Sequence, residues 1–194
     1  MTQIAALYVA AGGAYFGLEG VDPWDETRDA RLYEGPFPVV AHPPCNVWCQ
    51  LAHVNQARYG IRVGDDGGCF ARALDIVRRF GGVLEHPAFS CAWEHFKILR
   101  PVHGCWKRDM FSGEWVTQVA QSAYGHRARK LTWLIYVGTE PPALDWSRPE
   151  ADAQVSYGKK AGGGYWREPL TKKQAKASPP AFRDLLISMA RGSR

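Results

Sequence analysis

Short apolar runs that end on glycine, proline or a polar side chain recur along this chain, and such runs are typical of buried parallel strands. Residues 4–9 form the first run and lead into a glycine-rich turn. Residues 39–41 form another, which stops at two prolines because proline lacks the backbone donor that a strand ladder needs. Residues 83–84 form a third, directly before a glutamate. The pattern predicts strands over these segments, and residues 20–25 offer a further strand end.

A helix is predicted between the second and third of these strands. Its apolar residues recur at i, i+3, i+4 and i+7, the spacing of one helix face packed on a sheet: Phe70, Ala73, Leu74 and Val77. The glycines at 81 and 82 end this helix, since glycine commonly follows the last helical residue.

The second half of the chain predicts two more strands and a closing helix. Residues 115–121 alternate between apolar and polar positions, and residues 130–137 form a convincing strand. The helix starts at Pro179 and Pro180, with Ser178 as its expected cap. These elements predict an α/β fold with a Rossmann-like, mostly parallel sheet flanked by helices, in one compact domain.

Composition agrees with a globular protein of one domain. The chain has 194 residues, of which 46% are hydrophobic. No stretch approaches the roughly 18 apolar residues that a membrane helix needs, and the first residues carry no basic leader. We therefore expect no membrane association and a cytoplasmic location.

Positive charge is concentrated near the end of the sequence. Residues 151–194 hold nine Lys and Arg against three acids, whereas residues 1–150 hold fifteen against sixteen. A basic segment of this kind is typical of contact with phosphate backbones, and a solvated surface explains it equally well.

The cysteine pattern argues against a disulfide framework and against a metal site. The five cysteines are odd in number and lack paired short spacings: Cys45, Cys49, Cys69, Cys91 and Cys105. Cys45 and Cys49 can be grouped with His42 and His53, but zinc sites usually bring a second, well-spaced ligand pair. We expect no bound metal.

Chemically active side chains follow the predicted strands. Cys45 comes directly after the Pro43–Pro44 stop, and Glu85 follows the next predicted strand. In open α/β sheets the carboxyl ends of the strands form the edge where ligands bind. A thiol held there is either a nucleophile or a small packed hydrophobe.

Three motifs in order resemble the DNA cytosine-5 methyltransferase family. Its Pro-Cys nucleophile loop, its Glu-Asn-Val motif and its Gln-x-Arg-x-Arg motif correspond to residues 42–46, 84–87 and 124–129. The separations are similar to those of the family: 40 positions from Cys45 to Glu85 and 42 from Glu85 to Arg127. The resemblance covers residues 4–138, and residues 176–180 are weakly similar to the last motif of the family.

The resemblance implies a covalent mechanism. Cys45 adds as a thiolate to C6 of a pyrimidine, since C5 alone is a poor nucleophile. Glu85 is the acid near N3, with its pKa raised toward working pH by burial. Arg127 and Arg129 hold the base carbonyl and the flanking phosphate. An ordinary surface carboxylate and a solvated turn are the competing interpretations of Glu85 and of the two arginines.

The resemblance also implies S-adenosylmethionine as cofactor. The glycine-rich turn would contribute Ala10, Gly12 and Gly13, Pro44 would lie beside them, and Asp22 is the best match for the acid at the nucleoside end. The chain departs from the family here, because only about thirty residues precede Cys45 after this turn, too few for one cofactor-binding βα unit. His86 and Pro87 also replace the usual Asn-Val.

Three regions follow from the resemblance: a methyltransferase-like catalytic core over residues 1–138, a loop-rich basic insertion over 139–175 in place of a target-recognition region, and a helix over 176–194 that packs back on the core. Lys159, Lys160 and His126 are expected to contact nucleic acid. So small an insertion favours low sequence specificity, a homodimer or partner subunit, or a substrate that is already unpaired, such as single-stranded DNA or a free pyrimidine nucleotide. A minimal enzyme of this size fits a phage.

Three other interpretations stay open. The same Cys45 and Glu85 chemistry can serve a donor other than S-adenosylmethionine, or a base that is already modified. A catalytically inactive relative would keep the fold and bind nucleic acid through its basic segment. Amino-methyltransferases carry Asn-Pro-Pro-Tyr or Asp-Pro-Pro-Tyr at a similar strand end, although an aromatic residue would then stand where Cys45 does.

Overall fold

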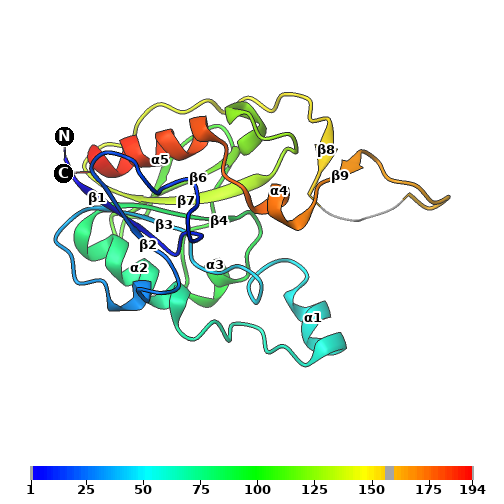
Figure 1. Ribbon diagram of the computed structural model, residues 1–194, viewed down its shortest axis with the longest axis horizontal. Helices are drawn as coiled ribbons and strands as arrows, with labels where there is room; N and C mark the ends of the chain where they lie inside the picture. The colour runs from blue at the N-terminus through cyan, green and yellow to red at the C-terminus, as the bar shows by residue number, and fades with distance from the viewer. Residues whose placement is uncertain (1, 156–159, 194) are drawn as a thin grey trace.

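The computed structural model describes residues 2–155 and 160–193 and shows a seven-stranded sheet with helices on both faces (Figure 1). The strand order is β2-β1-β3-β4-β7-β6-β5. The strands are β1 (Ile4–Leu7), β2 (Val21–Trp24), β3 (Val39–Ala41), β4 (Gly82–Pro87), β5 (Lys107–Arg108), β6 (Trp115–Ala120) and β7 (Leu131–Val137). A separate two-stranded sheet pairs β8 (Ala153–Gln154) with β9 (Glu168–Pro169).

The helices are short except for two of twelve residues each, α2 (Cys69–Phe80) and α5 (Pro180–Arg191). The others are α1 (Ala52–Tyr59), α3 (Ala92–His95), α4 (Lys172–Lys176) and the 3₁₀ helices η1 (Ala30–Leu32) and η2 (Gln121–Tyr124). The predicted strands and both predicted long helices are confirmed, and the α/β class with them.

The sheet is mixed, because two strands, β5 and β7, run against the other five. β1 pairs in parallel with β2 and β3, and β3 pairs in parallel with β4. β7 lies between β4 and β6 and is antiparallel to both. The chain goes from β1 to β2 on one side and then to β3 on the other, so the strand order reverses beside β1. Ligands of open α/β sheets bind in the crevice at such a reversal.

The helix α2 covers one face of the sheet (Figure 1). Its apolar stripe is buried, as its spacing predicts, and Phe70 lies at the centre of an aromatic cluster. The Phe70 ring packs 5.1 Å from the ring of His86 and 5.7 Å from that of Trp93. Aromatic pairs at these separations add to the stability that burial provides.

The helix α5 covers the opposite face (Figure 1). Phe182 and Leu186 are fully buried against the sheet. Pro180 occupies the first turn as expected, but the N-cap residue is Pro179 and makes no side-chain cap. The prediction that Ser178 caps this helix is therefore wrong. The Arg183 Nη1 atom donates to the carbonyl of Ala14 at 3.1 Å, so this end of α5 lies beside the loop after β1.

Candidate active site

The carboxyl ends of β1, β3, β4 and β6 lie at one edge of the sheet, together with the start of β7. Ala41, the last residue of β3, is in register with Leu84 of β4. The next residues along, His42 and Glu85, therefore lie side by side. The imidazole Nδ1 of His42 is 2.9 Å from Oε2 of Glu85, and the Glu85 side chain is only 11% exposed.

Tyr15, in the loop after β1, extends this pair. Its hydroxyl lies 2.8 Å from Nε2 of His42. When Nδ1 of a neutral His42 carries the proton toward Glu85, Nε2 accepts from the Tyr15 hydroxyl. Burial, reinforced by the charge of Glu85, raises the pKa of Tyr15, so the phenol stays protonated. The three side chains form a continuous hydrogen-bonded chain.

Gln121 joins the chain from the other side of Glu85. Its Nε2 donates to Oε1 of Glu85 at 3.2 Å and to Oγ1 of Thr132 at 2.9 Å. This orientation is the favourable one, because a flipped amide would point its oxygen at the carboxylate. Gln121 is fully buried, and its Oε1 has no hydrogen-bond partner among the described residues. Such an unpaired acceptor is unusual, because nearly all buried polar atoms in proteins are hydrogen-bonded.

Glu85 is an ionised carboxylate in this arrangement. Burial raises its pKa, but the hydrogen bond and charge of His42, with the charges of Lys130 and His86, outweigh burial and lower the pKa to about 2. The prediction that burial lifts the pKa of Glu85 toward working pH is therefore wrong. The sequence alone could not show that His42 and Gln121 lie at the two oxygens of this carboxylate.

Cys45 lies at the same edge and is half-buried. Burial raises the pKa of its thiol, and so do the charge of Glu85 and the neighbouring Cys49, while Lys176 and Lys130 act in the opposite direction. Cys45 and Glu85 are thus close enough for the charge of one to affect the other. In this state the thiol is protonated at neutral pH.

Lys130 is the half-buried cation of the site, and sequence reasoning missed it. Its Nζ donates to the carbonyl of Ala177 at 3.2 Å and approaches that of Lys176 at 3.5 Å. Burial lowers its pKa, whereas the charges of Glu85 and Cys45 raise it. Lys130 therefore ties the connection between α4 and α5 to the edge that carries the thiol.

Two non-glycine residues at this edge have left-handed backbone angles. Tyr8, directly after β1, has φ of 59°, and Lys130, directly before β7, has φ of 37°. Such angles are unfavourable for residues with a Cβ and are enriched at functional sites. The Tyr8 hydroxyl is also buried without a hydrogen-bond partner among the described residues.

The arginines of the predicted base-binding motif are placed differently from Lys130. Arg127 is bound to two carboxylates, Asp152 at 3.0 Å and Glu168 at 2.6 Å, and so ties the β8–β9 sheet to the core. Arg129 is exposed. The structure gives neither arginine a contact with Cys45 or Glu85, and the cation beside those two residues is Lys130.

Of the three residues expected to contact nucleic acid, one is buried, one is exposed and one lies outside the described residues. His126 is buried, and its Nδ1 accepts from the backbone N–H of Ala128 at 3.0 Å. Lys160 is exposed, with its Nζ 5.5 Å from the centre of the Trp166 ring. Lys159 lies outside the described residues. Of the three, Lys160 is a described side chain that is free to meet a phosphate.

His86, which replaces the usual asparagine after Glu85, faces the opposite side of the sheet. It is fully buried against Phe70 and Trp93. Burial lowers its pKa to about 4, so the ring is neutral near pH 7. Its contribution is to the aromatic cluster under α2, and it does not share the face of Glu85.

The glycine-rich turn is a tight exposed loop. Gly12 has φ of 61°, and the N–H of Gly13 donates to the carbonyl of Ala10 at 2.9 Å. A Cβ on Gly13 would lie 2.7 Å from that carbonyl oxygen, so this position requires glycine. Pro44 is exposed nearby in the segment after β3.

Asp22 does not fit the acid that S-adenosylmethionine would need. Its carboxylate is occupied by the guanidinium of Arg28 and by the indole N–H of Trp24 at 2.8 Å. The acid at the carboxyl end of β2 is Asp25, but its Oδ1 accepts from the backbone and hydroxyl of Thr27 at 3.0 and 2.6 Å. The residues present therefore do not fit the cofactor as the family resemblance implies.

Two further features are absent from the described residues. Among residues 2–155 and 160–193, no three His, Cys, Asp or Glu side chains are placed to hold a metal ion. Within the same residues, no helix has the length and apolar character needed to cross a bilayer.

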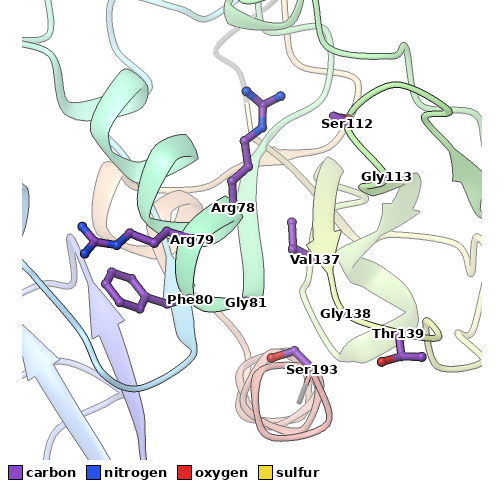
Figure 2. Close-up of a pocket in the computed structure, with 10 residues that line it drawn as sticks. All are labelled: Arg78, Arg79, Phe80, Gly81, Ser112, Gly113, Val137, Gly138, Thr139 and Ser193. Atoms are coloured by element: carbon purple, nitrogen blue, oxygen red, sulfur yellow. The ribbon is translucent and has the colours of Figure 1, made fainter.

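A shallow hollow at the opposite edge of the sheet lacks comparable chemistry (Figure 2). The residues that line it include no Cys, His, Asp or Glu. Arg78 points away from Ser193, as Figure 2 shows, and its guanidinium makes two hydrogen bonds, at 2.8 and 3.0 Å, to the buried carboxylate of Glu114. This hollow therefore lacks the kinds of side chain that gather around Glu85.

The fold and this cluster define the chain as an α/β protein with a thiol, a carboxylate, an imidazole and an ammonium group at the ligand-binding edge of its sheet. Comparison with family models, with curated proteins and with solved structures finds no match. The three regions expected at 1–138, 139–175 and 176–194 stay a prediction.

The coupling between Glu85 and Cys45 predicts a change in thiol reactivity. Replacing Glu85 by Gln should speed alkylation of Cys45 by iodoacetamide at pH 7 about three-fold, because loss of the anion lowers the thiol pKa and raises the thiolate fraction. Replacing Lys130 by Met should slow it. Peptide mass spectrometry measures both rates.

The exposed Cys105 serves as the internal control, since its alkylation should be the same in all three proteins. An unchanged ratio of Cys45 to Cys105 labelling in the Gln variant would show that the carboxylate does not act on the thiol.

Proposed function

We propose that this chain modifies C5 of a pyrimidine in DNA through a covalent bond from Cys45 to C6, as DNA cytosine-5 methyltransferases do. The observation that carries the proposal is the convergence of Cys45 and Glu85, 40 positions apart in the sequence, on one edge of the sheet. The resemblance in three motifs supports it independently of the geometry.

The covalent step follows from ordinary pyrimidine chemistry. After the Cys45 thiol loses its proton to solvent, sulfur bonds to C6 and the electron pair of the C5–C6 double bond moves to C5 and N3. C5 then bonds to an electrophile, which is a one-carbon group or, without a donor, a proton. Loss of the original C5 proton to solvent returns the electron pair to the C5–C6 bond, the C6–sulfur bond breaks and the thiolate is restored, while N3 gives its proton back to Glu85.

The hydrogen-bonded chain supplies the proton that N3 needs. When His42 is protonated, its Nδ1 proton passes to Oε2 of Glu85, and from there to N3. His42 is left neutral, with its Nε2 proton facing the oxygen of Tyr15. Tyr15 therefore need not ionise. Lys130 offsets the negative charge that develops beside Glu85 and Cys45.

The fold supports a Rossmann-like, methyltransferase-like interpretation of the core. The strand order reverses beside β1, and the proposed active site lies at the carboxyl ends of the strands next to that reversal. Asp22 is occupied by Arg28 and Trp24 and so is not available to the ribose of S-adenosylmethionine. Calorimetry with S-adenosylmethionine tests whether that compound is the one-carbon donor.

Deuterium exchange at C5 tests the nucleophile without any donor. DNA incubated with the protein in heavy water should gain deuterium at C5 of cytosine, measured by mass spectrometry of the nucleosides. Cys45→Ala should abolish the exchange, because no bond to C6 forms. Cys105→Ala, which removes an exposed thiol, is the matched control and should exchange like the unchanged protein.

Exchange that persists in Cys45→Ala would refute the mechanism. No exchange on cytosine or uracil, in single-stranded DNA, duplex DNA or free nucleotides, would refute the proposed function and favour a nucleic-acid-binding protein without activity.

A further inference from the structure

An exposed aromatic patch lies beside the β8–β9 sheet. Trp166 is 68% exposed, Val155 40% and Tyr165 38%. The Nζ of Lys160 lies 5.5 Å from the centre of the Trp166 ring. An exposed indole beside a lysine is the combination by which proteins hold unpaired bases and their phosphates.

The segment that carries this patch is basic. Residues 160–177 contain five Lys or Arg and one acid, Glu168, which is bound to Arg127. Arg167 is paired with Glu150. The described residues supply no ion pair to the remaining cations, which are all exposed: Lys160, Lys172, Lys173 and Lys176.

The C-terminal end of this basic segment lies at the proposed active site. α4 is held there by Lys130, whose Nζ donates to the carbonyl of Ala177, and the charge of Lys176 acts on Cys45. Figure 1 shows α4 beside the edge of the main sheet, and β9 with the chain before it extending outward from the body. An extended strand lying along residues 160–177 would therefore reach Cys45.

We infer that residues 160–177, with Trp166 as the stacking platform, bind single-stranded DNA and lead an unpaired pyrimidine to Cys45. The inference deepens the proposed function and rests on it for the chemistry at Cys45. A duplex fits less well, because its bases present no free face to Trp166 and flipping one out costs a few kcal/mol.

Fluorescence anisotropy with a labelled oligonucleotide tests this surface. In the Cys45→Ala background, a mixed-sequence single strand should bind at least about ten-fold more tightly than its duplex. Trp166→Ala should weaken single-strand binding about ten-fold, the loss of one stacked base. Phe111→Ala is the matched control, because Phe111 is fully exposed at the opposite edge of the sheet and should have no effect.

The salt dependence gives a second measurement. Replacing Lys172 and Lys173 together by Ala should reduce the slope of log K against log salt by about 1.4, since each phosphate contact on a single strand contributes about 0.7. Lys107→Ala, which removes an exposed cation of β5, should leave the slope unchanged. Circular dichroism checks that each variant is folded.

The outcomes separate the two proposals. Equal or tighter binding of the duplex, or Trp166→Ala binding like its parent, would overturn the single-strand surface even if C5 exchange occurs. Single-strand binding that depends on Trp166, without C5 exchange, would support the surface and refute the proposed function.

Discussion

Replacing Glu85 by Gln is expected to slow deuterium exchange at C5 by a factor of about 100 to 10,000, the range that a positioned acid or base contributes. Gln is close in shape to Glu and can still accept from His42, but it cannot carry a proton from His42 to N3. The initial rate of exchange, measured on the DNA that the wild-type chain deuterates, checks the expectation.

The alkylation rate of Cys45 in the same variant separates loss of the acid from loss of the nucleophile. The same substitution should make Cys45 more reactive toward iodoacetamide, so a slower exchange cannot be attributed to a weaker nucleophile. Glu34→Gln is the matched control, since Glu34 is an exposed carboxylate paired with Arg72 and Arg79 away from the site. Exchange at the wild-type rate in Glu85→Gln would rule out proton transfer through Glu85.

Replacing Phe70 by Ala is expected to lower the free energy of unfolding by about 3 to 5 kcal/mol, the usual cost of removing a buried phenyl ring. Phe70 is fully buried, and its ring stacks 5.1 Å from that of Phe96 and lies 5.9 Å from that of Trp48. Its removal leaves a cavity among the four aromatic rings that contact Phe70, where α2 meets the sheet. Urea denaturation followed by circular dichroism measures the change.

Phe111→Ala again serves as control, because a fully exposed ring should change the free energy of unfolding by no more than about 0.5 kcal/mol. A loss below about 1 kcal/mol in Phe70→Ala would mean that the aromatic cluster is not a packed core.

The elements with a clear hydrophobic period could be predicted from sequence. The stripe from Phe70 to Val77 defines α2, and the apolar runs before His42 and Glu85 define β3 and β4. The direction of β7 could not be predicted, because a buried antiparallel strand has the same apolar pattern as a buried parallel one. The expected sheet was therefore more parallel than the observed one.

The candidate site was predictable only at positions where a chemically active side chain closely follows an apolar run. Glu85 follows one directly, and Cys45 follows the two prolines that end another. Tyr15, Gln121 and Lys130 reach the site from loops and from the start of an antiparallel strand, and local sequence does not encode those placements. His42 directly follows the apolar run of β3 and so carried the same signal. The family motif, however, assigns the reaction to the cysteine that follows the prolines.

Arg127 shows the opposite failure. The Arg-x-Arg spacing matched the family motif, yet Asp152 and Glu168, 25 and 41 positions further along, bind its guanidinium. Pairing across such distances depends on the β8–β9 sheet, which is held by two short strands with no distinctive pattern. The motif therefore identified the segment that precedes β7, whereas the cation that the structure places beside Cys45 and Glu85 is Lys130.

The left-handed backbone of Tyr8 and Lys130 has an evolutionary consequence. Each residue costs about 1 kcal/mol or more relative to glycine at the same angles, so selection for thermal robustness alone would favour glycine at both positions. Glycine would also delete the ammonium group beside the thiol and the buried phenol beside the reversal of strand order. Natural variation or laboratory evolution toward higher thermal stability should therefore change other positions. It should retain Tyr8 and Lys130 for as long as activity is also selected.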